Sequence, residues 1–280
     1  MLLVPNFREW QYRAFSEDGI RPASAYGKSL TPGENTYGSY VGLITTPLTY
    51  DCFGIEIIIS SGVTVSESRN HLITIGKDDA GGTTYVDWLT HLLAVGPASY
   101  QDGGIKYFFP MFIPAGATIA AKASVNNATV RTVRVLCKCY GLPRNPETIR
   151  YATIFRTFGE TTASSSGTAI TPGTTSEGAW AQLGSATAEN LWWWQIGLGL
   201  DNAAVTTQLL HLDLGAGDAT NKRVIMQDVA IYISAAESST TRASTEEASQ
   251  VIPVGDLIYG RAQGSTTIDT GYSMIAYGVG

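Results

Sequence analysis

The sequence is poor in charge. Asp, Glu, Lys and Arg make up 15% of its 280 residues, against about 25% in an average soluble protein. A surface with few charges loses little hydration energy when it is buried, which suits β-rich proteins and subunits of permanent assemblies. Hydrophobic residues reach 44% and aromatic residues 10%, so the composition excludes disorder.

The charge and the hydrophobic pattern argue against nucleic acid and membranes as partners. The formal net charge is −6, and wrapping nucleic acid requires a basic surface, so we expect no nucleic-acid partner. The chain lacks a run of 18 apolar residues, so we expect no membrane insertion. The first ten residues lack a basic segment followed by an apolar core, so we expect no signal peptide.

Cysteine is scarce as well. The three cysteines are Cys52, Cys137 and Cys139, and an odd number with one Cys-x-Cys pair is not a disulfide framework. Cys137 and Cys139 fall in an alternating run and face the same side of a strand. We expect them to pack in a core; a metal or redox role is the alternative.

Catalytic motifs are missing. The sequence contains no Gly-x-Ser-x-Gly, His-Glu-x-x-His or P-loop. It has three histidines, and neither His71 nor His211 is matched by histidine in the internal repeat described below. We therefore expect no enzymatic activity and no cofactor, although a triad is assembled in space and spacing alone does not exclude one.

Two acidic loops contain carboxylates of the kind that bind calcium. Asp78-Asp79 and Asp218 follow Gly76 and Gly215 at matching places. Calcium requires several oxygen ligands, and the second loop supplies a single carboxylate. The sequence favours solvated turns and predicts no metal site.

An internal repeat spans the chain. Gly27 to Gly33 matches Gly167 to Gly173, both ending in Thr-Pro-Gly, and Phe112 to Ala123 matches Val251 to Ala262 around Ile-Pro-x-Gly. Both copies close on Tyr-Gly, at residues 140–141 and 277–278. Ordered matches at a nearly constant offset indicate duplication of a unit of about 140 residues.

The shared pattern has the period of β-strands. Ile55, Ile57 and Ile59 alternate with other residues, and Gly- and Pro-rich turns separate the runs. We predict an all-β fold of two tandem antiparallel β-sandwich domains, jelly-roll-like, from an internal duplication. The predicted boundaries are an N-terminal arm at 1–26, repeat 1 at 27–141, a linker and lead-in at 142–166, and repeat 2 at 167–280. Asp87 to Leu93, which could form a helix, is predicted as a strand equivalent to the one beginning at Asp228.

The first 20 residues contain four aromatic residues before the strand pattern begins. These are Phe7, Trp10, Tyr12 and Phe15. They are candidate interface residues of an arm that docks on a neighbouring subunit. A short helix packed on its own domain is the alternative.

The run Trp192-Trp193-Trp194 is the most unusual stretch. By the repeat, Trp192 and Trp194 replace Phe53 and Ile55 and belong to the core. Trp193 replaces Gly54 and points to the opposite face. It either covers the second face of its sheet, anchors a subunit interface, or stacks on a sugar ring.

Four features together carry a resemblance to a known class of proteins. They are the duplicated Ile-Pro-x-Gly-x-x-Ile-x-x-Lys/Arg-Ala segments at 113–123 and 252–262, the Thr-Pro-Gly turns, the low charge and the terminal Tyr-Gly. The chain resembles structural proteins of tailed-bacteriophage virions. The resemblance implies a non-enzymatic subunit of a capsid decoration, collar, baseplate or tail component, made in the host cytoplasm and located in the virion. Its implied partners are other virion proteins and further copies of itself. A receptor- or glycan-binding tail module, with host surface glycan as a partner, is the alternative.

Overall fold

The computed structural model describes residues 12–15, 27–61, 69–96, 105–126, 133–141, 150–160, 162–164, 167–200, 208–234, 239–240, 250–265 and 271–280. The described residues include no helix long and apolar enough to cross a membrane. The strands of the first repeat are β1 (Tyr12–Phe15), β2 (Lys28–Leu30), β3 (Gly33–Glu34), β4 (Val41–Ile44), β5 (Cys52–Ser61), β6 (Arg69–Asp78), β7 (Val86–Gly96), β8 (Ile105–Phe109), β9 (Thr118–Val125) and β10 (Val133–Gly141). Those of the second repeat are β11 (Phe155–Phe158), β12 (Thr168–Ile170), β13 (Ala181–Gln182), β14 (Trp193–Leu200), β15 (Gln208–Gly217), β16 (Lys222–Ser234), β17 (Ser239–Thr240), β18 (Leu257–Gly264) and β19 (Tyr272–Val279).

Each repeat folds as its own pair of sheets. Sheet 1A contains β1, β10, β5 and β8, with β2 also on β10, and sheet 1B contains β3, β9, β6 and β7, with β4 also on β9. Sheet 2A contains β11, β19, β12 and β14, and sheet 2B contains β13, β18, β15, β16 and β17. Apart from the short parallel pairing of β3 with β9, the strand pairs are antiparallel. The predicted all-β fold of two tandem sandwiches is confirmed.

The strand registers align the two repeats residue by residue. Ile55 pairs with Cys139, and Trp194, 139 positions after Ile55, pairs with Gly278, 139 positions after Cys139. The same offset relates the β6–β9 ladder to the β15–β18 ladder. The two repeats therefore share one topology.

Two of the sequence matches are displaced. The structural counterpart of Tyr140-Gly141 is Val279-Gly280, two residues beyond the second Tyr-Gly. Asp87 pairs with Gly76, and Val224 pairs with Gly215, so Val224 is the counterpart of Asp87 and the predicted alignment to Asp228 is wrong by four residues. Both stretches are strands, as predicted. The hairpin that joins the paired residues is two residues shorter in the second repeat, from Gly215 to Val224 against Gly76 to Asp87, so a constant offset fails there.

The repeated Ile-Pro-x-Gly segment is a turn that closes each sandwich. Gly116 and Gly255 end these turns with φ of 89° and 94°, in the left-handed region that glycine occupies at little cost. The Asp51 carboxylate accepts the backbone N–H of Ala115 at 2.7 Å, and the Asn190 side chain accepts that of Val254 at 3.1 Å. The shared motif is explained by the fold.

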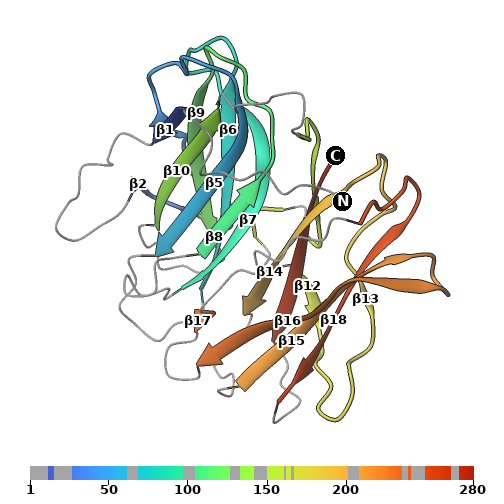
Figure 1. The fold of residues 1–280 in the computed structure, drawn as a ribbon. Coiled ribbons are helices and arrows are strands. Elements are labelled where there is room, and N and C mark those ends of the chain that lie inside the picture. Colours follow the sequence, from blue (N-terminus) through green and yellow to red (C-terminus); the bar gives the residue numbers. More distant parts are fainter. Residues whose placement is uncertain are drawn as a thin grey trace.

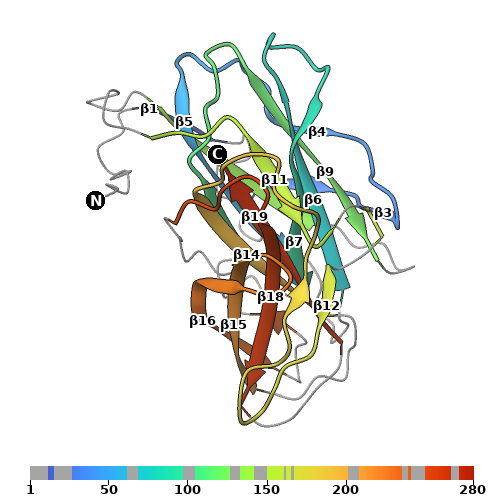
Figure 2. The same cartoon turned by 90° about the vertical axis from the view of Figure 1, so that its right-hand side faces the viewer.

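Sheet 2A lies between the first repeat and sheet 2B (Figure 1). The view in Figure 2 shows β7 of the first repeat beside β14 and β19 of the second. One face of sheet 2A therefore packs in its own sandwich, and the other faces the first repeat. The predicted domain boundaries remain predictions, and residues 142–149 of the expected linker lie outside the described residues.

Candidate functional site

The outer face of sheet 2A forms the contact between the repeats. Trp193 is 4% exposed, and its indole N–H donates to the backbone carbonyl of Phe108 on β8 at 3.1 Å. The ring of Trp193 also packs edge-on against Phe108, with centroids 5.9 Å apart. Trp193 covers the second face of its sheet, as one interpretation of the sequence held, and the cover is the neighbouring repeat.

A buried amide continues the contact along β14. The Gln195 side chain is fully buried, and its Oε1 accepts the backbone N–H of Phe108 at 3.2 Å. Trp193 and Gln195 thus satisfy both backbone polar groups of Phe108, which lies on the edge strand of sheet 1A. An edge strand has unpaired backbone groups that need partners when buried.

Two tyrosine hydroxyls provide hydrogen-bond partners for the backbone of β7, the edge strand of sheet 1B. The Tyr277 hydroxyl accepts the N–H of Leu93 at 2.8 Å and donates to the carbonyl of His91 at 2.9 Å. The Tyr107 hydroxyl donates to the carbonyl of Leu93 at 2.6 Å. Burial raises the pKa of both phenols, so they stay protonated and remain able to donate.

Close approach of the sheets depends on Gly197. A Cβ at this position would lie 3.1 Å from the Tyr107 hydroxyl oxygen, 3.2 Å from the Leu93 Cβ and 3.3 Å from the Tyr277 hydroxyl oxygen. The missing side chain leaves room for the tyrosine hydroxyls to reach the edge of β7.

Residues just before β11 join the two repeats on another side. The Arg150 guanidinium lies over the Trp192 ring at 4.2 Å, and Tyr151 packs on Phe53 with centroids 5.3 Å apart. Phe53 and Trp192 are counterparts in the two repeats. These contacts, with the sheet 2A contact, hold the repeats in one arrangement.

Each repeat also carries a charged cluster, on the outer face of sheet 1B in the first repeat and of sheet 2B in the second. The first cluster comprises Tyr37, Tyr40, Asp87, His91 and Lys122. The Lys122 ammonium is 2.7 Å from an Asp87 carboxylate oxygen and lies over the Tyr37 and Tyr40 rings at 5.0 and 4.8 Å. Tyr40 donates a hydrogen bond to Asp87, and Tyr37 is 2.8 Å from His91 Nδ1.

The ionisation states follow from burial and from these partners. Burial alone would raise the pKa of Asp87, but hydrogen bonds from Lys122 and Tyr40 outweigh it and lower the pKa. Burial lowers the pKa of His91, and Lys122 lowers it further, against opposition from Glu160 and Asp87. His91 is therefore neutral near pH 7 and shares a hydrogen bond with the Tyr37 hydroxyl, whose own pKa burial raises.

The second cluster occupies the equivalent place on sheet 2B. It comprises Glu177, Trp180, Asp213, Asp228 and Arg261. Arg261 bonds to Asp213 at 2.9 and 2.7 Å through two nitrogens, and pairs with Glu177. Its guanidinium lies 4.2 Å from the Trp180 ring centroid. Arg261 replaces Lys122, and Trp180 replaces Tyr40, so a cation on an aromatic ring is common to both repeats.

A glycine makes room for each of these aromatic rings. A Cβ on Gly76 would lie 2.5 Å from the Tyr40 ring, and one on Gly215 would lie 2.8 Å from the Trp180 ring. Because Gly76 and Gly215 are counterparts, this arrangement is a duplicated structural feature.

The second cluster has three carboxylates that could in principle hold a metal ion. Oxygens of Glu177, Asp213 and Asp228 lie within 4.8 Å of one another. Arg261 already pairs with two of the three, so its guanidinium engages oxygens that a cation would need and offsets one of the three negative charges. The donor set therefore describes a salt-bridge network more closely than a metal centre.

The two acidic loops form turns that their own aspartates stabilise. Asp78 accepts the backbone N–H groups of Ala80 and Thr84 at 2.9 and 2.8 Å. Asp218 accepts those of Thr220 and Asn221 at 2.7 and 2.6 Å. Each carboxylate is occupied in stabilising its own loop.

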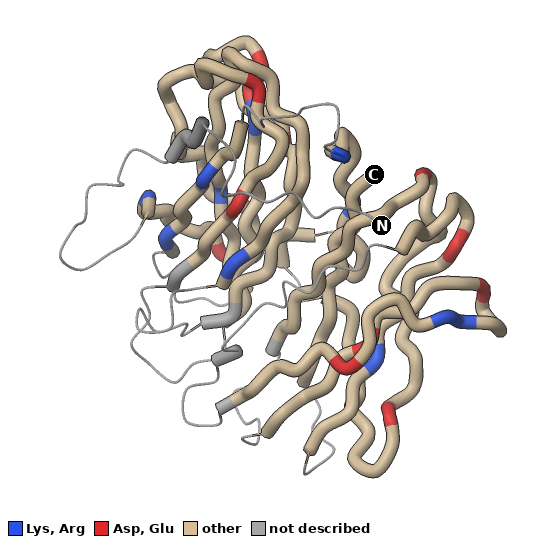
Figure 3. Tube along the Cα trace, in the orientation of Figure 1, with Lys and Arg blue, Asp and Glu red and all other residues tan. Residues whose placement is uncertain are grey.

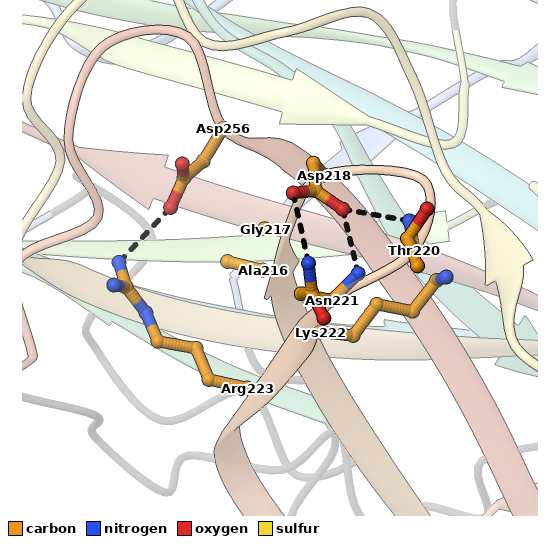
Figure 4. Close-up of a pocket in the computed structure, with 8 residues that line it drawn as sticks. All are labelled: Ala216, Gly217, Asp218, Thr220, Asn221, Lys222, Arg223 and Asp256. Carbon is orange, nitrogen blue, oxygen red and sulfur yellow. Dashed lines mark hydrogen bonds and ion pairs between the residues drawn. The ribbon is translucent and has the colours of Figure 1, made fainter.

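A shallow pocket of about 550 Å³ lies at the β15–β16 hairpin (Figure 4). Asp218 and Asn221 form one wall, and Arg223, paired with Asp256 at 3.0 Å, forms the opposite wall. The lining carries two acidic side chains, Asp218 and Asp256, and two basic ones, Lys222 and Arg223. The pocket therefore has no net charge that would attract an ionic ligand.

The structure places the remaining predicted residues as follows. Phe7 and Trp10 lie outside the described residues. Tyr12–Phe15 forms the strand β1 on β10 of its own repeat, and the rest of the first 20 residues lies outside the described residues. Trp193, at 4% exposure, has no face free to stack on a sugar, and the glycan-platform interpretation does not fit its position. A role of Phe7, Trp10, Tyr12 and Phe15 between subunits remains a prediction, whereas the contact of Trp193 lies between the repeats of one chain.

The cysteines are buried and unpaired by disulfides, in agreement with the expected core packing. Burial raises the pKa of Cys52 to about 12, which keeps its thiol protonated and unreactive. The contact residues Tyr107, Tyr277 and Gln195 were missed from sequence. A buried Gln in an otherwise apolar strand was the available signal.

These features define the class of protein: a tandem double β-sandwich whose two repeats are packed together through a buried contact. No family model matches the sequence, and no curated protein matches it. Among solved structures, the chain is similar to a peptide-N(4)-(N-acetyl-β-D-glucosaminyl) asparagine amidase, with 9% identity, a TM-score of 0.41 and 96% of each chain covered.

Two viral proteins show a similar likeness. The STIV MCP has 7% identity and a TM-score of 0.35, with 96% of this chain and 95% of that chain covered. A chain of the cowpea mosaic virus top component has 10% identity and a TM-score of 0.31, with 93% and 92% covered. Identities and TM-scores this low concern the fold and transfer neither an activity nor an assembly.

Proposed function

We propose that this chain is a non-enzymatic structural subunit of a virus particle of the tailed-phage type, acting by protein–protein packing in the virion. The observation that carries the proposal is the buried contact in which Trp193, Gln195 and Tyr277 satisfy the edge strands of the first repeat. It makes two sandwiches into one rigid block, which a building unit requires.

The charged clusters support the same proposal. In each cluster the cation is neutralised by carboxylates of the same repeat and rests on an aromatic ring. Groups that are fully engaged with one another stabilise a surface and are poorly placed to attack a substrate. The duplicated segments that resemble tailed-phage structural proteins give the proposal its particular setting.

Analysis of purified particles tests this function. Intact virions from the culture that carries the gene should contain the chain at a copy number of several or more per particle, measured by quantitative mass spectrometry. Binding of labelled full-length protein to particles lacking it should restore that number. Its absence from intact, gradient-purified particles would overturn the proposal.

The second candidate is a glycan-binding tail module, and one observation favours it. The half-buried rings of Tyr37, Tyr40 and Tyr85 surround the Lys122–Asp87 pair, and aromatic rings beside hydrogen-bonding groups can hold a sugar. A glycan array with the full chain and with Tyr40→Ala tests it. Binding that is lost in Tyr40→Ala but kept in Tyr50→Ala would establish this function; no binding to any glycan would remove it.

A further inference from the structure

The contact inside the chain joins two particular surfaces. The outer face of sheet 2A, through Gly197 and Tyr277, lies against the edge strand β7 of sheet 1B at Leu93. Leu93 and its strand partner Leu72 are each 1% exposed. Sheet 2A thereby covers the edge of sheet 1B at Leu93.

Because the repeats share one topology, the covered surface has a counterpart on the second repeat. Leu72 pairs with Leu93 as His211 pairs with Ala230. On sheet 2B this surface is open: Ala230 is exposed, and the neighbouring pair Leu209 and Tyr232 are 37% and 48% exposed. We call Leu209, His211, Asp228, Ala230 and Tyr232 face 2B.

The covering surface also has a counterpart, on the first repeat. The register aligns Gln195, Gly197 and Tyr277 with Glu56, Ile58 and Lys138. Ile58 and Leu136, which pair across β5 and β10, are both half-buried. We call Glu56, Ile58, Lys106, Leu136 and Lys138 face 1A.

The two faces have complementary charge. On face 1A, Lys106 and Lys138 both pair with Glu56, at 2.7 and 2.8 Å, which leaves one positive charge in excess. Arg134 adds another on the same side of β10, where it pairs in register with Ser60. Basic residues lie on the sheet 1A side of the first repeat in Figure 3. On face 2B, Asp228 is 53% exposed and lies beside the carboxylates of the second cluster.

We propose that face 1A of one copy binds face 2B of a second copy, repeating between chains the order of packing that holds within the chain. Apolar residues at the centre of both faces and opposite charges around them match the anatomy of a specific protein interface. Such a contact uses two different surfaces, so it builds a closed ring or an open filament.

The strand β1, which precedes the first repeat, lies beside face 1A. β1 pairs with β10 as β11 pairs with β19, which gives Phe15 the register position of Thr157. Within the chain, the Thr157 hydroxyl donates to the carbonyl of Thr90 at 2.8 Å, across the contact between repeats. The register therefore puts a predicted interface residue at the border of face 1A.

Sedimentation of two full-length variants tests the proposal. Wild type should form oligomers whose size rises with concentration and falls with salt. The double variant Leu209→Arg/Tyr232→Arg blocks face 2B, and Ile58→Arg blocks face 1A; each should weaken self-association about tenfold or more. Val254→Arg, at an apolar residue 57% exposed elsewhere in the second repeat, should behave as wild type. Circular dichroism checks that every variant is folded.

Mixing the two blocked variants decides the geometry. Each retains the face that the other has lost, so an equimolar mixture should form a one-to-one dimer and nothing larger. A wild type that stays monomeric at millimolar concentration, or blocked variants that assemble as wild type does, would overturn the proposal. A mixture that remains monomeric would overturn the head-to-tail arrangement.

The inference deepens the proposed structural role and rests on it, but the two fail separately. A chain present in particles whose oligomers ignore both blocking variants contradicts only the inference. A chain that assembles head to tail but is absent from particles contradicts only the proposed function.

Discussion

Tyr277 and Leu93 lie 184 residues apart, and the hydroxyl of Tyr277 accepts the backbone N–H of Leu93 at 2.8 Å. Leu93 lies on β7, the edge strand of sheet 1B, and Tyr277 on β19 of the other repeat. A single side chain thus supplies the partner that a neighbouring strand would supply in the interior of a sheet.

Removing that hydroxyl should destabilise the protein without altering its shape. We expect Tyr277→Phe to lower the free energy of unfolding by about 1–3 kcal/mol, because the buried N–H of Leu93 loses its partner. Urea unfolding measures the change. Tyr50→Phe, at a tyrosine 46% exposed, should change stability by less than about 0.5 kcal/mol. Equal effects at the two positions would contradict the assigned role.

Trp193 distinguishes packing from ligand recognition. Trp193→Ala should lower the free energy of unfolding by about 3–5 kcal/mol, the usual cost of emptying a buried aromatic site, with loss of the hydrogen bond to Phe108. Thermal and urea unfolding provide the measurement, with Val254→Ala as an exposed control. Unchanged stability, together with loss of sugar binding, would restore the glycan-platform interpretation.

The sequence predicted the duplication and the β-sandwich class because strand alternation and turn glycines are local signals. Residues expected in the core, such as Ile55, Ile57 and Trp194, are fully buried. The contact between repeats was not predictable in the same way. Tyr107 and Tyr277 alternate like other strand residues, and only the placement of one sandwich beside the other gives their hydroxyls a partner.

His91 and Asp228 also show where pattern fails. They are counterparts in the bulges of β7 and β16, with φ of 59° and 53°, and each N–H is held by a side chain of the adjacent strand, Thr74 or Asp213. A bulge shifts the register by one residue. Beyond it, a strict period of two therefore assigns each side chain to the wrong face of the strand.

Backbone conformation at the second bulge predicts an unequal response to substitution. Asp228→Asn should be tolerated, because Asn adopts positive φ readily. Asp228→Val should cost about 1–3 kcal/mol, because a branched side chain is strained there. Ala230→Val, two residues further along the strand at an exposed site, serves as the control and should have little effect. Differential scanning calorimetry of the three variants measures the difference in Tm.

Acidification should weaken the first cluster. The pKa of His91 is lowered in the folded protein by burial and by Lys122, whereas in the unfolded chain it is near 6.5. The unfolded state therefore binds the proton first, and stability falls as pH drops below about 6.5. Urea midpoints between pH 7.5 and 5.5 should decline in wild type and decline less in His91→Asn. Equal slopes would mean that other groups govern the pH response.

The edge of β7 has a consequence for biosynthesis. Translation at about 5–20 residues per second separates Leu93 from Tyr277, 184 residues later, by roughly 10 to 40 s. During that interval the nascent first repeat presents an uncapped β-edge, the kind of surface that recruits other strands. That edge is where pairing between two nascent chains would begin.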